Sequence, residues 1–195
     1  MAEQEMSLRE RTRRAVRTEI VDAAMSLFLS QGFEATTIEE IARAAGISRR
    51  SYFRYFASKD EAFAAALASI GRTIAETLSR RPADEPPWAA LRRSFDPLLE
   101  QAGADPNAEA LGRLILERPA LQQGKDAVWQ TEIATALLPR LAAGGADDGS
   151  LRAHALSAAA ITCLHVAQAQ WLTADEQRDL GALLDTTMNA VHPTA

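Results

Sequence analysis

Apolar residues recur every three or four positions along most of the chain, which is the spacing of helices with one buried face. The first such helix is predicted over about 11–30, and the Gln31-Gly32 pair is a plausible end for it. The sequence Thr37-Ile38-Glu39-Glu40 matches a capping box and predicts a short helix over 37–45 that ends at Gly46. Ser48 is a suitable N-cap for a second short helix over 49–56.

Further helices are predicted beyond these two. Ser58 precedes a long helical pattern that runs to about residue 80, and the proline-rich segment 81–87 then forms a linker. Pro97 and Pro139 fall inside predicted helices, so a kink or a break is expected at each. The remaining helices are expected near 87–101, 106–117, 119–143, 151–172 and 174–191, with a loop at 144–150.

The composition supports an all-α fold and limits the environment. Alanine occurs 40 times against 5 valines and 9 isoleucines, so helix formers outnumber β-branched residues. Cys163 is the single cysteine, which excludes an internal disulfide and a cysteine zinc site. The N-terminus has no apolar secretory segment, and no apolar run is long enough for a membrane helix. We therefore expect a cytoplasmic protein with no membrane partner.

The charge is distributed unevenly. The net charge of −5 argues against a protein that coats nucleic acid over its whole surface. Yet residues 9–17 contain five arginines and one acid, and residues 41–59 contain five basic residues and no acid. The second segment coincides with the two short helices and their glycine turn, the length and punctuation of a helix-turn-helix. Local binding to DNA is therefore the favoured interpretation; the alternative is a solvated surface, which normally mixes both signs.

The residue types in this segment suit contacts to DNA. Arg49 and Arg50 begin the second short helix, where side chains reach base edges and an arginine can bind guanine N7 and O6. Hydroxyl groups and the lysine suit phosphate contacts, which orient a protein without reading sequence. Residues of that kind are Thr36, Thr37, Tyr55 and Lys59.

The segment TTIEEIARAAGISRRSYFRYFASKDE resembles the DNA-binding signature of the tetracycline-repressor (TetR) family of bacterial regulators. The resemblance covers roughly residues 14–74. Its matching positions are Thr36, Thr37, Ile41, Ala42, Ala45, Gly46, Ser48, Tyr55, Phe56 and Lys59. The segment R-R-S-Y-F-R-Y-F, together with the C-terminal pattern, is similar to the mycofactocin-type subgroup.

Four positions depart from the family signature. Arg50 stands in place of Gly, Ser51 of Thr, Tyr52 of Leu and Phe53 of Tyr. Phe53 lacks the hydroxyl that the family tyrosine often gives to a phosphate, and Arg50 could replace that contact. The expected DNA-binding set is Thr36, Thr37, Arg43, Ser48, Arg49, Arg50, Ser51, Phe53, Tyr55 and Lys59.

The resemblance also implies an organisation for the rest of the chain. It divides the sequence into a DNA-binding domain over 11–60, with its motif at 37–56, a connecting helix over 61–80, and a ligand-binding and dimerisation domain over 81–195. A homodimer would form through the helices near 151–172 and 174–191. An apolar effector, such as an acyl-CoA, would enter between the middle helices. Candidate contacts are Trp88, Phe95, Leu99, Leu114, Trp129, Ile133, Cys163 and His165, although apolar residues at helical spacing more often form a core.

Catalysis has little support in the sequence. Cys163 and His165 are two positions apart, so on a helix they do not face each other. His154 and His165 share a helix face but stand about 16 Å apart, too far for one metal. No phosphate-binding loop or nucleophile motif occurs, so no cofactor, metal or catalytic residue is expected. The sequence thus predicts a ligand-responsive repressor that binds a palindromic operator; an activator or architectural DNA-binding protein without an effector is the alternative.

Overall fold

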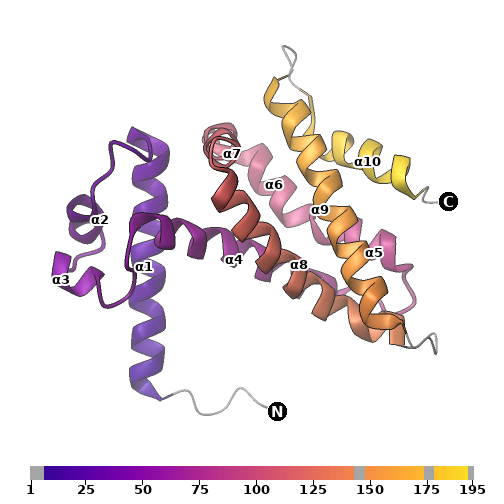
Figure 1. Cartoon of the computed structure of the whole chain (residues 1–195), viewed down its shortest axis with the longest axis horizontal. Coiled ribbons are helices and arrows are strands. Elements are labelled where there is room, and N and C mark those ends of the chain that lie inside the picture. Colours follow the sequence, from indigo (N-terminus) through magenta and orange to yellow (C-terminus); the bar gives the residue numbers. More distant parts are fainter. Residues whose placement is uncertain (1–6, 143–147, 174–177, 193–195) are drawn as a thin grey trace. The chain divides into compact units, whose positions relative to one another are not determined.

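The computed structural model describes residues 7–142, 148–173 and 178–192, and these residues contain helices and no strand (Figure 1). This confirms the predicted all-α class. The chain divides into two compact units, Met1–Leu67 and Ala68–Ala195, and the division falls inside helix α4. The helices are α1 (Leu8–Gln31), α2 (Ile38–Ala44), α3 (Arg49–Tyr52), α4 (Lys59–Arg80), α5 (Pro87–Ser94), α6 (Asp96–Ala104), α7 (Ala108–Leu116), α8 (Pro119–Ala142), α9 (Gly149–Thr173) and α10 (Leu180–Val191).

An aromatic cluster holds the N-terminal unit together. The rings of Phe28, Phe33 and Phe63 lie with their centroids 4.7 to 5.8 Å apart, and all three side chains are buried. These rings come from α1, from the loop that follows it and from the first part of α4, so one cluster joins three segments. The part of α1 before Ile20 buries no side chain, and its arginines face solvent.

The two short helices begin at the predicted residues. The Thr37 hydroxyl accepts a hydrogen bond from the Glu40 amide at 3.2 Å, and the Glu40 carboxylate accepts one from the Thr37 amide at 2.9 Å, which completes the capping box. The hydrogen bonds that the Thr37 amide and hydroxyl donate to the Glu40 carboxylate lower the pKa of Glu40. Gly46 has a φ of 67°, a backbone conformation that favours glycine, and it reverses the chain between the helices.

Helix α3 is shorter than the predicted 49–56. Ser48 caps it as expected, because its hydroxyl accepts the Ser51 amide at 3.1 Å. After Tyr52 the backbone tightens into three-residue turns, in which the Arg54 amide bonds the Ser51 carbonyl and the Tyr55 amide bonds the Tyr52 carbonyl. This tighter winding ends the α-helix.

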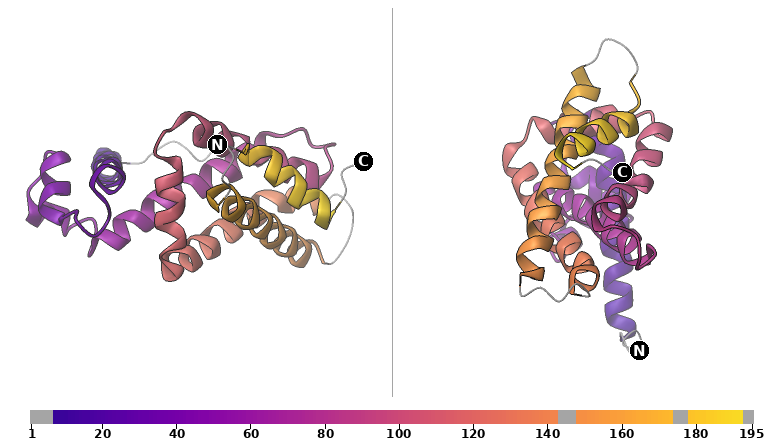
Figure 2. Two further views of the ribbon diagram at one scale, coloured as in Figure 1. Left: turned by 90° about the horizontal axis from the view of Figure 1, so that it is seen from above. Right: turned by 90° about the vertical axis from the view of Figure 1, so that its right-hand side faces the viewer.

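In the C-terminal unit, α9 packs between α8 and α10 (Figures 1 and 2). The predicted helix over 87–101 is divided at Phe95, because Pro97 occupies the first turn of α6, where a missing amide proton costs nothing. A kink or a break was expected at Pro139, and of these the break is not found, since α8 continues through it to Ala142. Residues 143–147 and 174–177, which include the predicted end of one helix, most of the 144–150 loop and the predicted start of another helix, lie outside the described residues.

A side chain of α8 holds the end of α4. The Arg140 guanidinium donates to the carbonyl oxygens of Leu78 at 2.8 Å and Arg81 at 2.6 Å, and also to that of Pro82. The last carbonyls of a helix have no partner within it, so a cation placed there stabilises the end. Arg140 therefore fixes the C-terminal end of α4 to α8.

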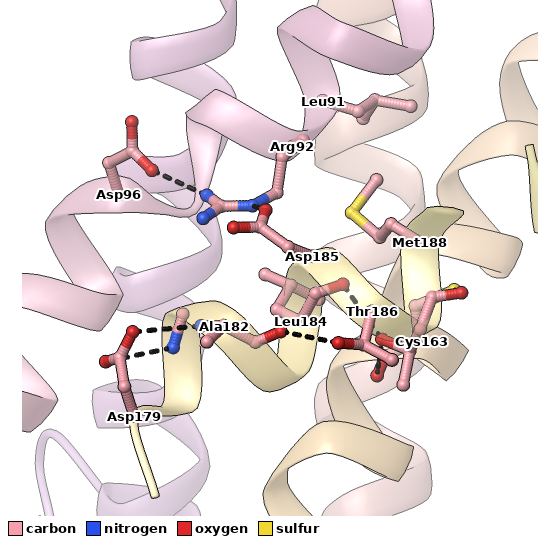
Figure 3. Close-up of polar contacts among 12 residues, drawn as sticks. Leu91, Arg92, Asp96, Cys163, Asp179, Ala182, Leu184, Asp185, Thr186 and Met188 are labelled. Atoms are coloured by element: carbon pink, nitrogen blue, oxygen red, sulfur yellow. Dashed lines mark hydrogen bonds and ion pairs between the residues drawn. The ribbon is translucent and has the colours of Figure 1, made fainter. Parts of the chain in front are cut away.

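Helix α10 is attached on two sides (Figure 3). Arg92 of α5 forms ion pairs with Asp96 and with Asp185 of α10. On the opposite side, the Thr187 hydroxyl donates to the Cys163 carbonyl of α9 at 3.0 Å. Asp179 caps the first turn of α10 by accepting the Ala182 amide at 2.9 Å.

Candidate functional site

The surface of α2, α3 and the turn after α3 presents exposed cations. Arg43, Arg49, Arg50 and Arg54 are all exposed, and Phe53 is 46% exposed beside them. This surface also contains the exposed side chains of Thr37 and Ser48, whereas Ser51 and Tyr55 are half-buried. Most of the expected DNA-binding set thus lies within reach of a partner molecule.

A hollow of about 700 Å³ joins the two basic segments of the sequence. It lies between the start of α1 and the turn after α3, so residues more than 40 positions apart in sequence line the same concavity. The lining contributes three guanidinium groups, two hydroxyl groups and one apolar side chain. The residues are Leu8, Arg9, Thr12, Arg13, Arg54 and Tyr55.

Two of the expected phosphate contacts, Thr36 and Lys59, make hydrogen bonds within the protein. Thr36 is buried, and its hydroxyl donates to the Gly32 carbonyl at 2.8 Å. The Lys59 ammonium donates to the carbonyls of Phe33 at 2.6 Å, Thr36 at 3.2 Å and Glu34 at 3.3 Å. An ammonium has three protons, and three carbonyl oxygens surround this one, so Lys59 closes the loop between α1 and α2. The sequence analysis did not predict this internal function.

Arg49 is held by two neighbours. Its Nε atom lies 2.7 Å from Oε1 of Glu39 in α2, and its guanidinium lies over the Phe53 ring, 5.4 Å from the centroid. Both charged side chains remain largely exposed, at 62% for Arg49 and 54% for Glu39. The sequence analysis named Glu39 within the capping-box segment but gave it no function at the site; its position two residues before the basic segment 41–59 was the available signal.

Tyr52 connects α3 to the start of α4. Its side chain is fully buried, and its hydroxyl donates to the Ser58 carbonyl at 2.9 Å, immediately before α4. Burial raises the pKa of Tyr52 to about 12, and the nearby Glu61 and Asp60 carboxylates add to the shift. A leucine at this position, as in the family signature, could not make this bond. The departure at Tyr52 was noted in the sequence, but its partner was not.

The C-terminal unit brings the expected ligand contacts together in its core. Trp88, Phe95, Trp129, Ile133 and Cys163 are at most 4% exposed and belong to one apolar cluster. Leu99 packs against this cluster, while Leu114 and His165 are half-buried. The core interpretation, which the sequence analysis gave as the commoner one, therefore describes five of the eight residues.

An open groove of about 600 Å³ lies on the same unit. Leu99 is the expected ligand contact that borders it, and Trp171, Leu180 and the small residues of α6 supply most of the remaining apolar wall. Four charged residues also line it. They are Asp105, Glu109, Arg178 and Asp179.

A buried charge cluster joins α8 to α9. The Lys125 ammonium, 5% exposed, lies 2.9 Å from Asp126 Oδ1, 3.1 Å from His165 Nε2 and 4.2 Å from the centre of the Trp129 ring. Burial lowers the pKa of Lys125, and burial followed by the nearby ammonium lowers that of His165. His165 was an expected ligand contact, whereas Lys125 and Asp126 were missed.

Two further searches concern the described residues alone. Among them, no three histidine, cysteine, aspartate or glutamate side chains are grouped so as to hold a metal ion. None of their helices has the length and hydropathy that crossing a bilayer requires.

Comparison with known proteins identifies both parts of the chain. Residues 20–66 match the family of bacterial regulatory proteins of the tetR type, and residues 85–195 match the MftR C-terminal domain. The chain therefore belongs to the TetR family of transcriptional regulators, which are DNA-binding proteins and not enzymes. Its larger part is the C-terminal domain of the MftR type, so the resemblance found in the sequence is confirmed.

Individual relatives agree with this assignment. The HTH-type transcriptional regulator TcmR of Streptomyces glaucescens is 36% identical over 121 residues, which are 58% of this chain and 54% of TcmR. The chain thus matches about half the length of that relative. FadR of Thermus thermophilus, a TetR family repressor solved with lauroyl-CoA, has a TM-score of 0.65 at 22% identity and covers 92% of this chain and 95% of its own. FadR of Bacillus halodurans, a fatty acid degradation regulator, has a TM-score of 0.61 at 19% identity, with coverage of 90% and 93%. At these identities the two structures support the fold alone.

Proposed function

We propose that the protein is a ligand-responsive repressor that binds a palindromic operator as a homodimer and is released by a small apolar effector. In this proposal residues 11–60 bind DNA, the helix over 61–80 transmits the signal, and residues 81–195 bind the effector and the second subunit. A protein that controls bacterial genes works in the cytoplasm, the compartment expected from the sequence.

The observation that carries the proposal is the excess of exposed arginines on the helix-turn-helix surface. Four exposed arginines lie on α2, α3 and the turn, and the hollow beside them adds Arg9 and Arg13 of α1. Clustered arginines release counterions from the DNA backbone, and those at the start of α3 can reach base edges. Segment 41–59 contains no acidic residue, and the carboxylate paired with one of these arginines, that of Glu39 with Arg49, comes from outside it.

The outer face of α9 supports the homodimer. From residue 153 to residue 173 this helix has no Asp, Glu, Lys or Arg, although part of its surface is exposed. The exposed side of a surface helix normally carries charges, so an uncharged exposed face favours burial against a partner. Val166 on this face is 55% exposed, and Leu151 near its start is 70% exposed.

The open groove of about 600 Å³ is the candidate binding site for the effector. Its volume lies within the range of small-molecule sites, and its lining combines apolar with charged residues. One neighbour in fold is solved with lauroyl-CoA. An effector with an acyl chain that lies along Leu99 and Trp171 is the class we would screen first.

The test begins with a pool of randomised duplexes from which the purified protein selects sequences. The proposal expects enrichment of a palindrome, bound by wild type but at least about 10-fold more weakly by the Arg49→Ala/Arg50→Ala double variant. Light scattering should give twice the mass of one chain, and mass spectrometry of the native protein should identify what it carries. Enrichment of no sequence, or equal binding by the double variant, would refute the proposal.

The sign of regulation needs a separate measurement. A reporter gene whose promoter contains the selected duplex should be silenced by wild type and restored when the co-purified molecule is added. Stimulated expression would instead indicate an activator.

A further inference from the structure

The contact between Glu39 and Arg49 has a geometry that suits base recognition. Glu39 approaches the Nε side of the guanidinium, where Nε and Oε1 are 2.7 Å apart. Guanine recognition requires two donors at the end of the side chain, directed at O6 and N7. A carboxylate on the Nε side leaves the terminal Nη groups for that purpose and removes freedom of rotation from the guanidinium.

Phe53 restricts the same group from another direction. Its ring lies under the guanidinium, and the edge-to-face contact with the buried Tyr52 ring, at 5.8 Å, holds it in place. Tyr52 is itself fixed through its hydrogen bond to the Ser58 carbonyl. The orientation of Arg49 is thus set by one carboxylate and by the Phe53 ring, which the edge-to-face contact with Tyr52 supports.

We propose that Glu39 and Phe53 hold Arg49 in the orientation in which it specifies a single guanine in each half of the operator. The inference rests on the proposed function and adds to it a positioning pair and the base that is read. Holding a side chain in its bound geometry reduces the ordering entropy that binding costs. An exposed ion pair contributes little to folding stability. Loss of the Glu39–Arg49 pair is therefore expected to lower the specificity of DNA binding and not the stability of the protein.

The variants separate orientation from charge. Glu39→Ala removes the acceptor, whereas Glu39→Gln removes the charge but keeps an oxygen that can accept the Nε proton. Glu76→Ala is the matched control, because Glu76 is also an exposed glutamate paired with an arginine, Arg80, at 3.2 Å. Phe53→Ala and Phe53→Tyr form a second pair, in which the tyrosine keeps the ring.

The experiment uses the duplex selected by wild type and measures, by fluorescence anisotropy, the affinity ratio between guanine and adenine at each position. The position read by Arg49 is the one where Arg49→Ala loses the preference. There we expect Glu39→Ala and Phe53→Ala to lower the ratio by roughly 3-fold or more. Glu39→Gln, Phe53→Tyr and Glu76→Ala should keep the wild-type ratio.

Two results would overturn the inference while leaving the proposed function intact. One is an unchanged ratio in Glu39→Ala. The other is a change in affinity that is equal for all duplexes and equal in Glu39→Ala and Glu39→Gln, which would indicate charge or folding alone. If wild type selects no sequence, the proposed function itself fails first. Circular dichroism of each variant verifies that it is folded.

Discussion

The ammonium of Lys59, the first residue of α4, lies 2.6 Å from the carbonyl oxygen of Phe33. Two further carbonyls of the loop between α1 and α2 also accept hydrogen bonds from it. The charge that the sequence analysis assigned to a DNA phosphate therefore stabilises the polypeptide that leads into the helix-turn-helix. The two functions make different predictions.

Replacement of Lys59 by Met should lower the free energy of unfolding by about 2 kcal/mol, because the bonds of a charged donor to the loop carbonyls are lost. The dependence of DNA affinity on salt should keep its wild-type slope. Urea unfolding and anisotropy at several salt concentrations check both. Arg43→Ala is the control, with unchanged stability and a shallower slope. A shallower slope in Lys59→Met with unchanged stability would instead assign Lys59 to a phosphate.

Tyr52 should make stability fall at high pH. Its pKa is about 12 in the folded chain, against 10 when unfolded, so the neutral form is favoured by folding. The stabilisation is complete below pH 10 and is lost as the pH rises towards 12, by about 1 kcal/mol at pH 11. Urea unfolding at pH 8 and pH 11 should show this loss in wild type and in Tyr55→Phe. In Tyr52→Phe the loss of stability between pH 8 and pH 11 should be smaller than in wild type by about 1 kcal/mol. A loss equal to that of wild type would contradict the prediction.

Gly71 provides a test of packing in the C-terminal unit. A Cβ atom at this position would lie 2.4 Å from Cδ1 of the buried Trp129 ring. We expect Gly71→Ala to destabilise the protein by about 1–3 kcal/mol, because an overpacked ring outweighs the gain in helix propensity. Gly124→Ala, whose Cβ would meet nothing within 4 Å, should instead stabilise by about 0.5–1 kcal/mol. Thermal unfolding of both variants gives the comparison, and the same sign for both would be the adverse result.

The Lys125 cluster should respond asymmetrically to the loss of one partner. Asp126→Ala leaves a buried ammonium without its carboxylate, at a cost of about 3 kcal/mol. Lys125→Met replaces the ammonium by an apolar group of similar length and should change stability by less than about 1 kcal/mol. Urea unfolding at pH 7 measures both. Equal losses in the two variants would mean that the ion pair itself, and not the avoidance of a lone buried charge, stabilises the unit.

Local signals made much of the fold predictable. The capping box of Thr37 and Glu40 acts over three residues, so its chemistry is complete within the sequence window that reveals it. Pro97 likewise divides a predicted helix because it has no amide proton to donate within the helix. At Pro139 the same local argument predicted a kink or a break, and α8 continues through that residue without a break.

Contacts between distant segments were not predictable in this way. Lys59 bonds carbonyls 23 to 26 residues earlier, and its charge alone was equally compatible with a phosphate. The ion pair of Arg49 with Glu39 depends on how the Gly46 turn orients α3 against α2. In the C-terminal unit, apolar spacing could not separate core from pocket, because both require the same residue types on the same helix face.

The Arg140 contacts with the end of α4 have a consequence for the order of events during synthesis. Arg140 follows Leu78 by 62 residues, and a ribosome that adds roughly 5–20 residues per second needs about 3 to 12 s to reach it. Until then the last carbonyls of α4 lack this cation, and the Leu78 carbonyl has the Arg81 amide, 3.2 Å away, as its partner in the chain. The helix that runs from one unit into the other is therefore completed late, after the helix-turn-helix has already been made.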